Sequence, residues 1–326
     1  MSNIPSISQE LTEEKVKNCV FKNFNVLMPS YYDLLTNWLS SAYEVFKDID
    51  KYVILIYLIN NDFKFYIRNG IIIDYETFYS NKSLEIDKIN LIEISKDLKI
   101  PKESVRRKIS QLEKTGVIKR VSKKIFIDRS AYIKAQPIST LKNISKLMLE
   151  FSKLLKKDKL IEKDYNINDI EIMIEKSFSF CWYHWYQFLF LYLKRWKNYL
   201  GDLEILSIGL VIAINSVKNR DFTFKDLSSK EWQKNIMGSD PLGVNAMSIS
   251  DITNIPRPTV VRKLKYLMKN GFVTINKKKL YSFNIKNKKN YKKSTEIQDQ
   301  NINSLLYFLL RSFNQMNISY IFLRYK

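Results

Sequence analysis

Positively charged side chains gather in two segments of the 326-residue chain. Segment 101–134 contains 11 lysines and arginines against 3 acidic residues, and segment 256–293 contains 13 against none. Their net charges of +8 and +13 account for the whole formal charge of +21, so the remainder is neutral in aggregate. Lysine and arginine bind phosphate oxygens, and a basic excess confined to a few segments is typical of nucleic-acid-binding proteins.

The spacing within these segments separates the cations from an apolar stripe. Val105, Ile109 and Leu112 recur at the period of one helix face, which leaves the charged side chains on the opposite side. Arginine there can form two hydrogen bonds to guanine, whereas lysines further along hold phosphates; the alternative is an ordinary solvated face. The candidate DNA contacts are Lys102, Ser104, Arg106, Arg107, Lys114, Lys123 and Lys124 in the first segment, and Arg257, Thr259, Arg262, Lys263, Lys265, Lys269, Lys277, Lys278 and Lys279 in the second.

The two basic segments belong to an internal repeat. Shifted by 155 residues, segment 90–126 aligns without a gap on segment 245–281, and 13 of the 37 positions are identical. The same offset extends upstream, where Ile59 and Asn60 meet Ile214 and Asn215. Self-similarity of this extent indicates a duplication. We therefore predict two domains of ordinary length, residues 1–164 and 165–326.

The residues that position the cations predict two helices and a hairpin in each copy. Asn90 is expected to cap a short helix, Pro101 to open the next helix and Gly116 to end it. The turn between the helices favours a residue with a left-handed backbone conformation. That conformation is less favourable for Lys99 than for its equivalent Asn254. Two short apolar strands around a basic turn follow each second helix.

Helix, turn, helix and hairpin together make a winged helix-turn-helix. We predict this motif at residues 90–116 with a wing at 117–128, and again at 245–271 with a wing at 272–285. Longer apolar helices are expected on both sides, at Tyr31–Phe46, Tyr52–Ile59, Ile138–Leu155, Tyr186–Tyr199, Ile205–Val217 and Asn303–Phe313. The basic stretch Asn284–Lys293 is interpreted as an extension of the second wing or a flexible linker.

The segment ISKDLKIPKESVRRKISQLEKTGVIKR, residues 94–120, resembles the DNA-reading unit of MarR-like winged-helix regulators. The resemblance covers about 37 residues in each copy and implies dimerisation helices at both ends of the unit. The chain departs from the family in carrying both motifs itself. It also has about thirty residues, 61–89 and 216–244, where the family has a short connection.

These features predict a mainly α fold with small β-hairpin wings, in which two tandem winged helix-turn-helix domains are related by a pseudo-two-fold repeat. The expected function is sequence-specific binding of double-stranded DNA by a transcriptional regulator. It would act as a covalent pseudo-dimer, monomeric or further dimerised, on half-sites about one helical turn apart. The alternatives are a plasmid- or phage-type replication initiator, an architectural nucleoid protein, and a protein-interaction module, against which the charge concentration argues.

The aromatic segment 178–199 is interpreted as a helix buried between the halves, with His184 as a core residue. Its alternative role is a pocket for a planar small-molecule effector that tunes DNA binding.

Signatures of enzymes are missing from the chain. With one histidine, seven glycines and only Cys19 and Cys181, we expect no catalytic triad, no dinucleotide site, no metal site and no cofactor. Residues 1–17 contain no apolar core segment, and segment 178–193 is short for a membrane span, so a cytoplasmic, nucleoid-associated protein without a membrane partner is expected.

Overall fold

A computed structural model describes residues 10–130, 138–218, 231, 243–284 and 286–323. The chain is mainly helical, with two small antiparallel sheets, which confirms the mainly α prediction. The elements of the first half are α1 (Glu13–Lys22), α2 (Phe24–Phe46), α3 (Ile49–Arg68), α4 (Tyr75–Ser80), β1 (Ser83–Ile86), α5 (Leu91–Leu98), α6 (Lys102–Lys114), β2 (Ile118–Val121), β3 (Lys124–Asp128) and α7 (Ile138–Lys157). Those of the second half are α8 (Ile167–Lys176), α9 (Phe178–Leu200), α10 (Leu203–Lys218), α12 (Ala246–Thr253), α13 (Arg257–Lys269), β4 (Val273–Ile275), β5 (Tyr281–Phe283) and α14 (Lys288–Leu323).

Six helices of the first half each have an equivalent among the described helices of the second half. Helices α5 and α12 have eight residues each, α6 and α13 have thirteen each, and both pairs begin 155 residues apart. The ten-residue pair α1 and α8 and the 23-residue pair α2 and α9 begin 154 residues apart. The expected boundary at residue 164 falls in the connection between α7 and α8.

The 155-residue alignment upstream of the motif is wrong by one residue. Asp48 and Asp202 each accept a hydrogen bond from the backbone amide three residues later, and these caps start α3 and α10 at an offset of 154. Ile59 therefore corresponds to Ala213 and not to Ile214.

The predicted caps and turns of the paired helices are present. The Asn90 side chain accepts hydrogen bonds from two backbone amides of α5, and Asn245 does the same for one amide of α12. Pro101 lies one residue before the expected position, as the cap residue that precedes α6. Gly116 has φ +75°, which suits the residue just beyond the end of a helix.

Lys99 and Asn254, in the turns between the paired helices, both adopt left-handed backbone conformations, with φ 54° and 58°. Because this conformation costs a lysine more than an asparagine, we expect Lys99→Gly to raise the free energy of unfolding by about 0.5–1 kcal/mol, and Asn254→Gly by less. Urea denaturation of the two single variants measures the difference. A larger gain from Asn254→Gly, or a loss from Lys99→Gly, would contradict this account.

In each half a hairpin follows the paired helices. One further segment, from the stretch before those helices, pairs with the last strand of the hairpin. In the first half the strand order is β1-β3-β2, and β1 comes from the stretch between α3 and α5. In the second half Val244 exchanges two backbone hydrogen bonds with Tyr281 of β5, in the place that β1 takes on β3. The extra residues 61–89 thus form the end of α3, helix α4 and strand β1. Of the matching residues 216–244, positions 219–230 and 232–242 lie outside the described part.

Each predicted long helix lies within a longer observed one, and the basic stretch Asn284–Lys293 differs from its prediction. Residues from Lys288 onward are the first turns of the 36-residue helix α14, because Asn287 caps it by accepting a hydrogen bond from the Asn290 amide. The stretch is therefore neither a wing extension nor a linker beyond residue 287. Residue 285, the expected end of the second wing, lies outside the described residues.

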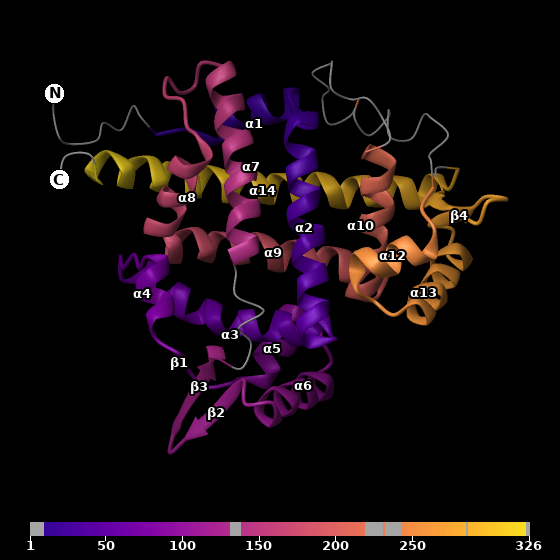
Figure 1. The fold of residues 1–326 in the computed structure, drawn as a ribbon, viewed down its shortest axis with the longest axis horizontal. Helices are drawn as coiled ribbons and strands as arrows, with labels where there is room; N and C mark the ends of the chain where they lie inside the picture. Colours follow the sequence, from indigo (N-terminus) through magenta and orange to yellow (C-terminus); the bar gives the residue numbers. More distant parts are fainter. Residues whose placement is uncertain (1–9, 131–137, 219–230, 232–242, 285, 324–326) are drawn as a thin grey trace.

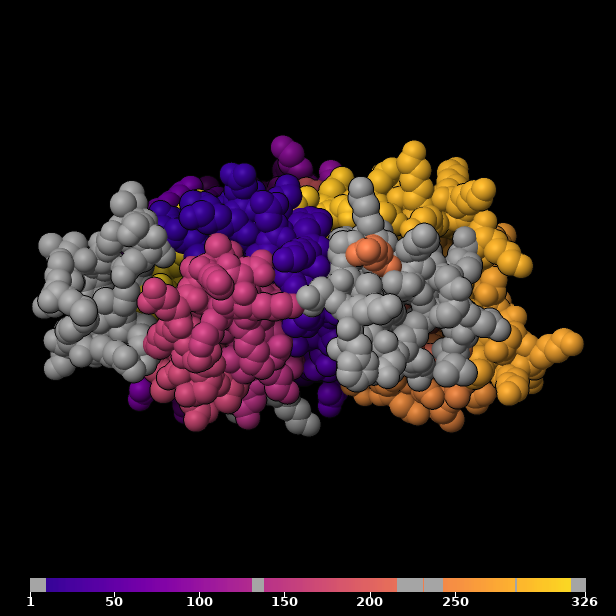
Figure 2. Space-filling model, turned by 90° about the horizontal axis from the view of Figure 1, so that it is seen from above, coloured from indigo at the N-terminus to yellow at the C-terminus, as the bar shows by residue number. Residues whose placement is uncertain are grey.

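The two halves pack through reciprocal contacts. Helix α2 packs on α10 while its equivalent α9 packs on α3, and α7 packs on α8 while its equivalent α14 packs on α1. In Figure 1, α2, α7 and α10 stand upright while α9, α14 and α3 run across. Seen from above, the indigo surface of the N-terminal helices adjoins the magenta surface of α7, which packs on α2 (Figure 2). Trp182 and Trp185 of α9 are buried in this core, as the aromatic segment predicted.

Among the described residues, no single helix is both long and apolar enough to cross a membrane. One pair, α9 with residues 203–215 of α10, passes that test together but is bent by 97°.

Candidate nucleic-acid interface

We refer to residues 91–128 of the first half as unit 1 and to residues 246–283 of the second half as unit 2. The apolar stripes of α6 and α13 face inward: Val105 and Leu112, like Val260 and Leu267, are at most 2% exposed. Burial of these stripes turns the opposite faces of α6 and α13 outward. Figure 1 places unit 1 at the lower edge of the molecule and unit 2 at its right edge.

Most of the predicted contacts lie on these outward faces. Ser104 and Thr259 are half-buried, and Lys263 differs from the others. The exposed residues are Lys102, Arg106, Arg107, Lys114, Lys123, Lys124, Arg257, Arg262, Lys265, Lys269, Lys277, Lys278 and Lys279.

Lys263 is not placed to contact a ligand outside the protein. Its side chain is 12% exposed, and its ammonium lies 2.6 Å from an oxygen of Asp202 and 2.9 Å from one of Glu204, at the start of α10. Burial lowers the pKa of Lys263, but its hydrogen bonds to the two carboxylates outweigh burial and raise the pKa overall, so it stays charged. The prediction of Lys263 as a DNA contact is therefore wrong.

The repeat places the same ion pair in the first half. Lys108, the equivalent of Lys263, is buried and bonds to Asp48, the residue that caps α3. In both halves a lysine from the inner side of the second helix thus ties the unit to the first turn of a long helix. Arg262 and Lys263 were both predicted as contacts, and the structure shows that only Arg262 faces outward.

Unit 1 carries carboxylates among its exposed cations. Glu103 pairs with Arg106, and Glu85 of β1 lies 2.9 Å from Lys124. Two further cations, in β2 and outside the predicted contacts, are also paired: Lys119 with Asp128 and Arg120 with Glu113. Arg107, Lys102, Lys114 and Lys123 have no ion pair with any described residue.

In unit 2, no carboxylate neutralises an exposed cation within the part of the chain that the structure describes. None of its exposed lysines and arginines forms an ion pair with a described residue. Its hairpin turn is also longer: the Asn276 side chain accepts hydrogen bonds from the amides of Lys278 and Leu280, whereas unit 1 turns within Ser122 and Lys123. The longer turn presents three consecutive exposed lysines, Lys277 to Lys279. Unit 2 is therefore the more strongly positive surface.

His184 lies in the core of the second half, in contact with the rings of Phe180 and Tyr307. Burial lowers its pKa to about 4, so it is neutral at pH 7. Among the described residues, no three histidine, cysteine or acidic side chains come close enough together to hold a metal ion.

Each unit thus presents a face of its own, built from a thirteen-residue helix with free cations on its outer side and a basic turn beside it. Such a surface can accept phosphates along its length and base edges at the first turns of α6 and α13. Comparison with known proteins found no matching family model, no matching curated protein and no matching solved structure.

Proposed function

We propose that this chain is a sequence-specific DNA-binding transcriptional regulator that carries two winged helix-turn-helix units. The observation that carries the proposal is the repeated pair α6 and α13, whose outward faces hold Arg107 and Arg262 without an ion pair to any described residue. An unpaired, exposed arginine on such a helix is the side chain suited to guanine in the major groove.

The connectivity supports the identification of the units. A winged helix has a helix, a strand, two helices and a hairpin whose last strand lies between the other two. Elements α3, β1, α5, α6, β2 and β3 follow that order, with the strand order β1-β3-β2. In the second half α10, Val244, α12, α13, β4 and β5 follow it as well.

The packing between the halves supports a pseudo-dimer within one chain. In a two-fold pair each contact occurs twice with the partners exchanged. The pairs α2–α10 with α9–α3, and α7–α8 with α14–α1, have this property. Two units related in this way suit an inverted repeat in DNA. Exposed cations of unit 1 form ion pairs with acids, whereas those of unit 2 form none with a described residue, which favours two unlike half-sites.

Selection of bound DNA from a randomised pool at about 150 mM salt tests the proposal, because specific and non-specific binding separate only at defined salt. The wild type is expected to enrich a two-part motif. Arg107→Ala and Arg262→Ala should each relax a different half by about 1–3 kcal/mol per lost base contact. Lys146→Ala, at an exposed position of α7, is the matched control and should enrich the wild-type motif.

Other results would decide between the remaining functions. Binding without enrichment would indicate an architectural protein in place of a regulator. Enrichment of iterated sites, together with strand opening, would indicate a replication initiator. A failure of all variants, wild type included, to bind any duplex would overturn the DNA interpretation.

A further inference from the structure

Five lysines and no acidic residue lie in residues 286–293, which lead from the hairpin of unit 2 into helix α14. All five are exposed: Lys286, Lys288, Lys289, Lys292 and Lys293. Lys293 lies 3.2 Å from an oxygen of Glu296, and the other four form no ion pair with a described residue. A surface of this charge attracts phosphates, yet it lies outside both units.

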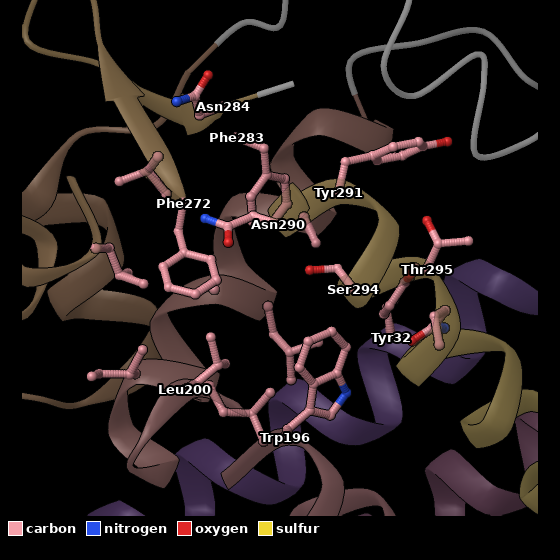
Figure 3. Close-up of a pocket in the computed structure, with 18 of the residues that line it drawn as sticks. Tyr32, Trp196, Leu200, Phe272, Phe283, Asn284, Asn290, Tyr291, Ser294 and Thr295 are labelled. Carbon is pink, nitrogen blue, oxygen red and sulfur yellow. The ribbon is translucent and has the colours of Figure 1, made fainter. Parts of the chain in front are cut away.

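The lysines of α14 lie on the side of the helix that faces away from unit 2. Asn287, Asn290 and Ser294 follow one another at intervals of three and four residues, so they share one face of the helix. Asn290 and Ser294 line a cavity of about 190 Å³ together with Phe272 of the hairpin, and Figure 3 shows both on the side of α14 that faces Phe272. The lysines fall between these positions and therefore occupy the opposite face, toward solvent.

Two asparagines join the start of α14 to the end of α13. The Asn290 side chain donates a 2.9 Å hydrogen bond to the carbonyl oxygen of Asn270, and the Asn287 side chain donates one of 3.3 Å to the carbonyl oxygen of Gly271. Carbonyl groups at the end of a helix have no partner within it, so these bonds satisfy acceptors that would otherwise need water. The start of α14 is therefore fixed to the helix that carries Arg262.

The start of α14 is bound at the end of α13 that lies opposite to its first turn. The first turn is the part suited to base edges, and thirteen residues at 1.5 Å each put about 20 Å between the two ends of α13. Each strand of DNA carries a phosphate about every 3.4 Å along the axis, so 20 Å corresponds to about six base pairs. Cations fixed at the far end are thus too distant to share phosphates with the first turn.

The first half has no equivalent cluster in its sequence. At the 155-residue offset, residues 286–293 correspond to residues 131–138, which contain one lysine, Lys134, against five in the second half. Positions 131–137 lie outside the described residues, so the comparison is one of sequence. The charge at the start of α14 is therefore an addition to the second copy alone.

We propose that Lys288, Lys289 and Lys292 bind DNA phosphates beyond the half-site that unit 2 contacts, so that the protein covers a longer stretch of duplex on the side of unit 2 than on the side of unit 1. This inference rests on the proposed function, since it needs a duplex bound at unit 2. Phosphate contacts contain no information about base sequence. These lysines therefore add affinity and leave the selected motif unchanged.

The test uses three duplexes that carry the selected motif: one with a flank of about one helical turn on both sides, and two that each lack one flank. The Arg107→Ala and Arg262→Ala selections identify the half-site of each unit. In fluorescence anisotropy at about 150 mM salt, the wild type is expected to lose at least tenfold in affinity without the flank beside the half-site of unit 2. Removing the other flank should cost less than twofold.

The variant Lys288→Gln/Lys289→Gln/Lys292→Gln should bind the fully flanked duplex at least tenfold more weakly than the wild type, with a salt slope lower by about 2.7. Removing the lysines and removing the flank eliminate the same contacts, so the two losses should not add. Glutamine forms helices about as well as lysine, and thermal unfolding checks that the variant is folded. The matched control Lys17→Gln/Lys142→Gln/Lys146→Gln has the same net charge and should keep the flank dependence of the wild type.

Hydroxyl-radical footprinting supplies a second readout, in which the triple variant should lose protection only in the flank beside the half-site of unit 2. Equal dependence of the wild type on both flanks, or on neither, overturns this inference and leaves the proposed function intact. Flank dependence that persists in the triple variant overturns it as well. If the wild type binds no duplex at all, the proposed function fails, and the inference fails with it.

Discussion

Replacing Lys277, Lys278 and Lys279 by glutamine is expected to weaken DNA binding about 10²-fold at 150 mM salt. The three lysines are consecutive, exposed and free of ion pairs with the described residues, so each can displace a counter-ion from a phosphate. Each phosphate contact contributes about 0.9 to the slope of log affinity against log salt, so the slope should fall by about 2.7. Fluorescence anisotropy with one duplex between 50 and 300 mM salt measures both quantities.

The matched control is the triple variant Lys17→Gln/Lys142→Gln/Lys146→Gln, which removes the same charge from exposed positions on α1 and α7. It should leave the salt slope within about 0.5 of the wild type, because screening confines the effect of these charges to about 8 Å at physiological salt. If both triple variants lost affinity equally, net charge and not the hairpin of unit 2 would control binding.

Replacing Lys263 by methionine is expected to lower the free energy of unfolding by about 1–3 kcal/mol and to leave the salt slope unchanged. The substitution leaves Asp202 and Glu204 without their cation at the start of α10, where their side chains are 42% and 28% exposed. Removing one partner of a fully buried pair costs about 3–5 kcal/mol, and the exposure of these carboxylates reduces that figure. Urea denaturation and salt-dependent anisotropy supply the two readouts.

Replacing the neighbouring residue, Arg262, is expected to have the opposite effect: it should weaken DNA binding and leave stability nearly unchanged. Arg262→Met removes an exposed cation without a partner, so stability should change by less than about 0.5 kcal/mol while affinity for the selected site falls at least tenfold. If Lys263→Met and Arg262→Met change the free energy of unfolding and the affinity for DNA in the same way, it is wrong that Lys263 stabilises the fold and Arg262 binds DNA.

Local features of this protein were readable in the chain because they depend on nearby residues. Asn90 and Asn245 cap helices, Gly116 takes a positive φ, and Val105 and Val260 face the core, as their neighbours in the sequence require. The duplication was equally visible, since two copies of a segment must fold alike when their caps and apolar stripes agree.

Strand β1 and the ion pairs depended instead on contacts between distant residues. Glu85 pairs with Phe126 across the sheet, and Lys108 reaches Asp48 over sixty positions, so periodicity within one segment contains no signal for either. A comparison of the copies could have found the lysine pairs, because Lys108 and Lys263 are identical and each lies at the edge of the apolar stripe.

The sequence by itself determined that this chain carries two basic helix pairs and where their charge lies, because capping, helical periodicity and net charge are properties of short segments. Only the tertiary structure decided which cations are free and where a cavity remains. Arg262 and Lys263 are adjacent and equally basic in the sequence, but the carboxylates at the start of α10 hold only Lys263. Gly209 and Ala213 become cavity walls only because α9, α13 and α14 surround them.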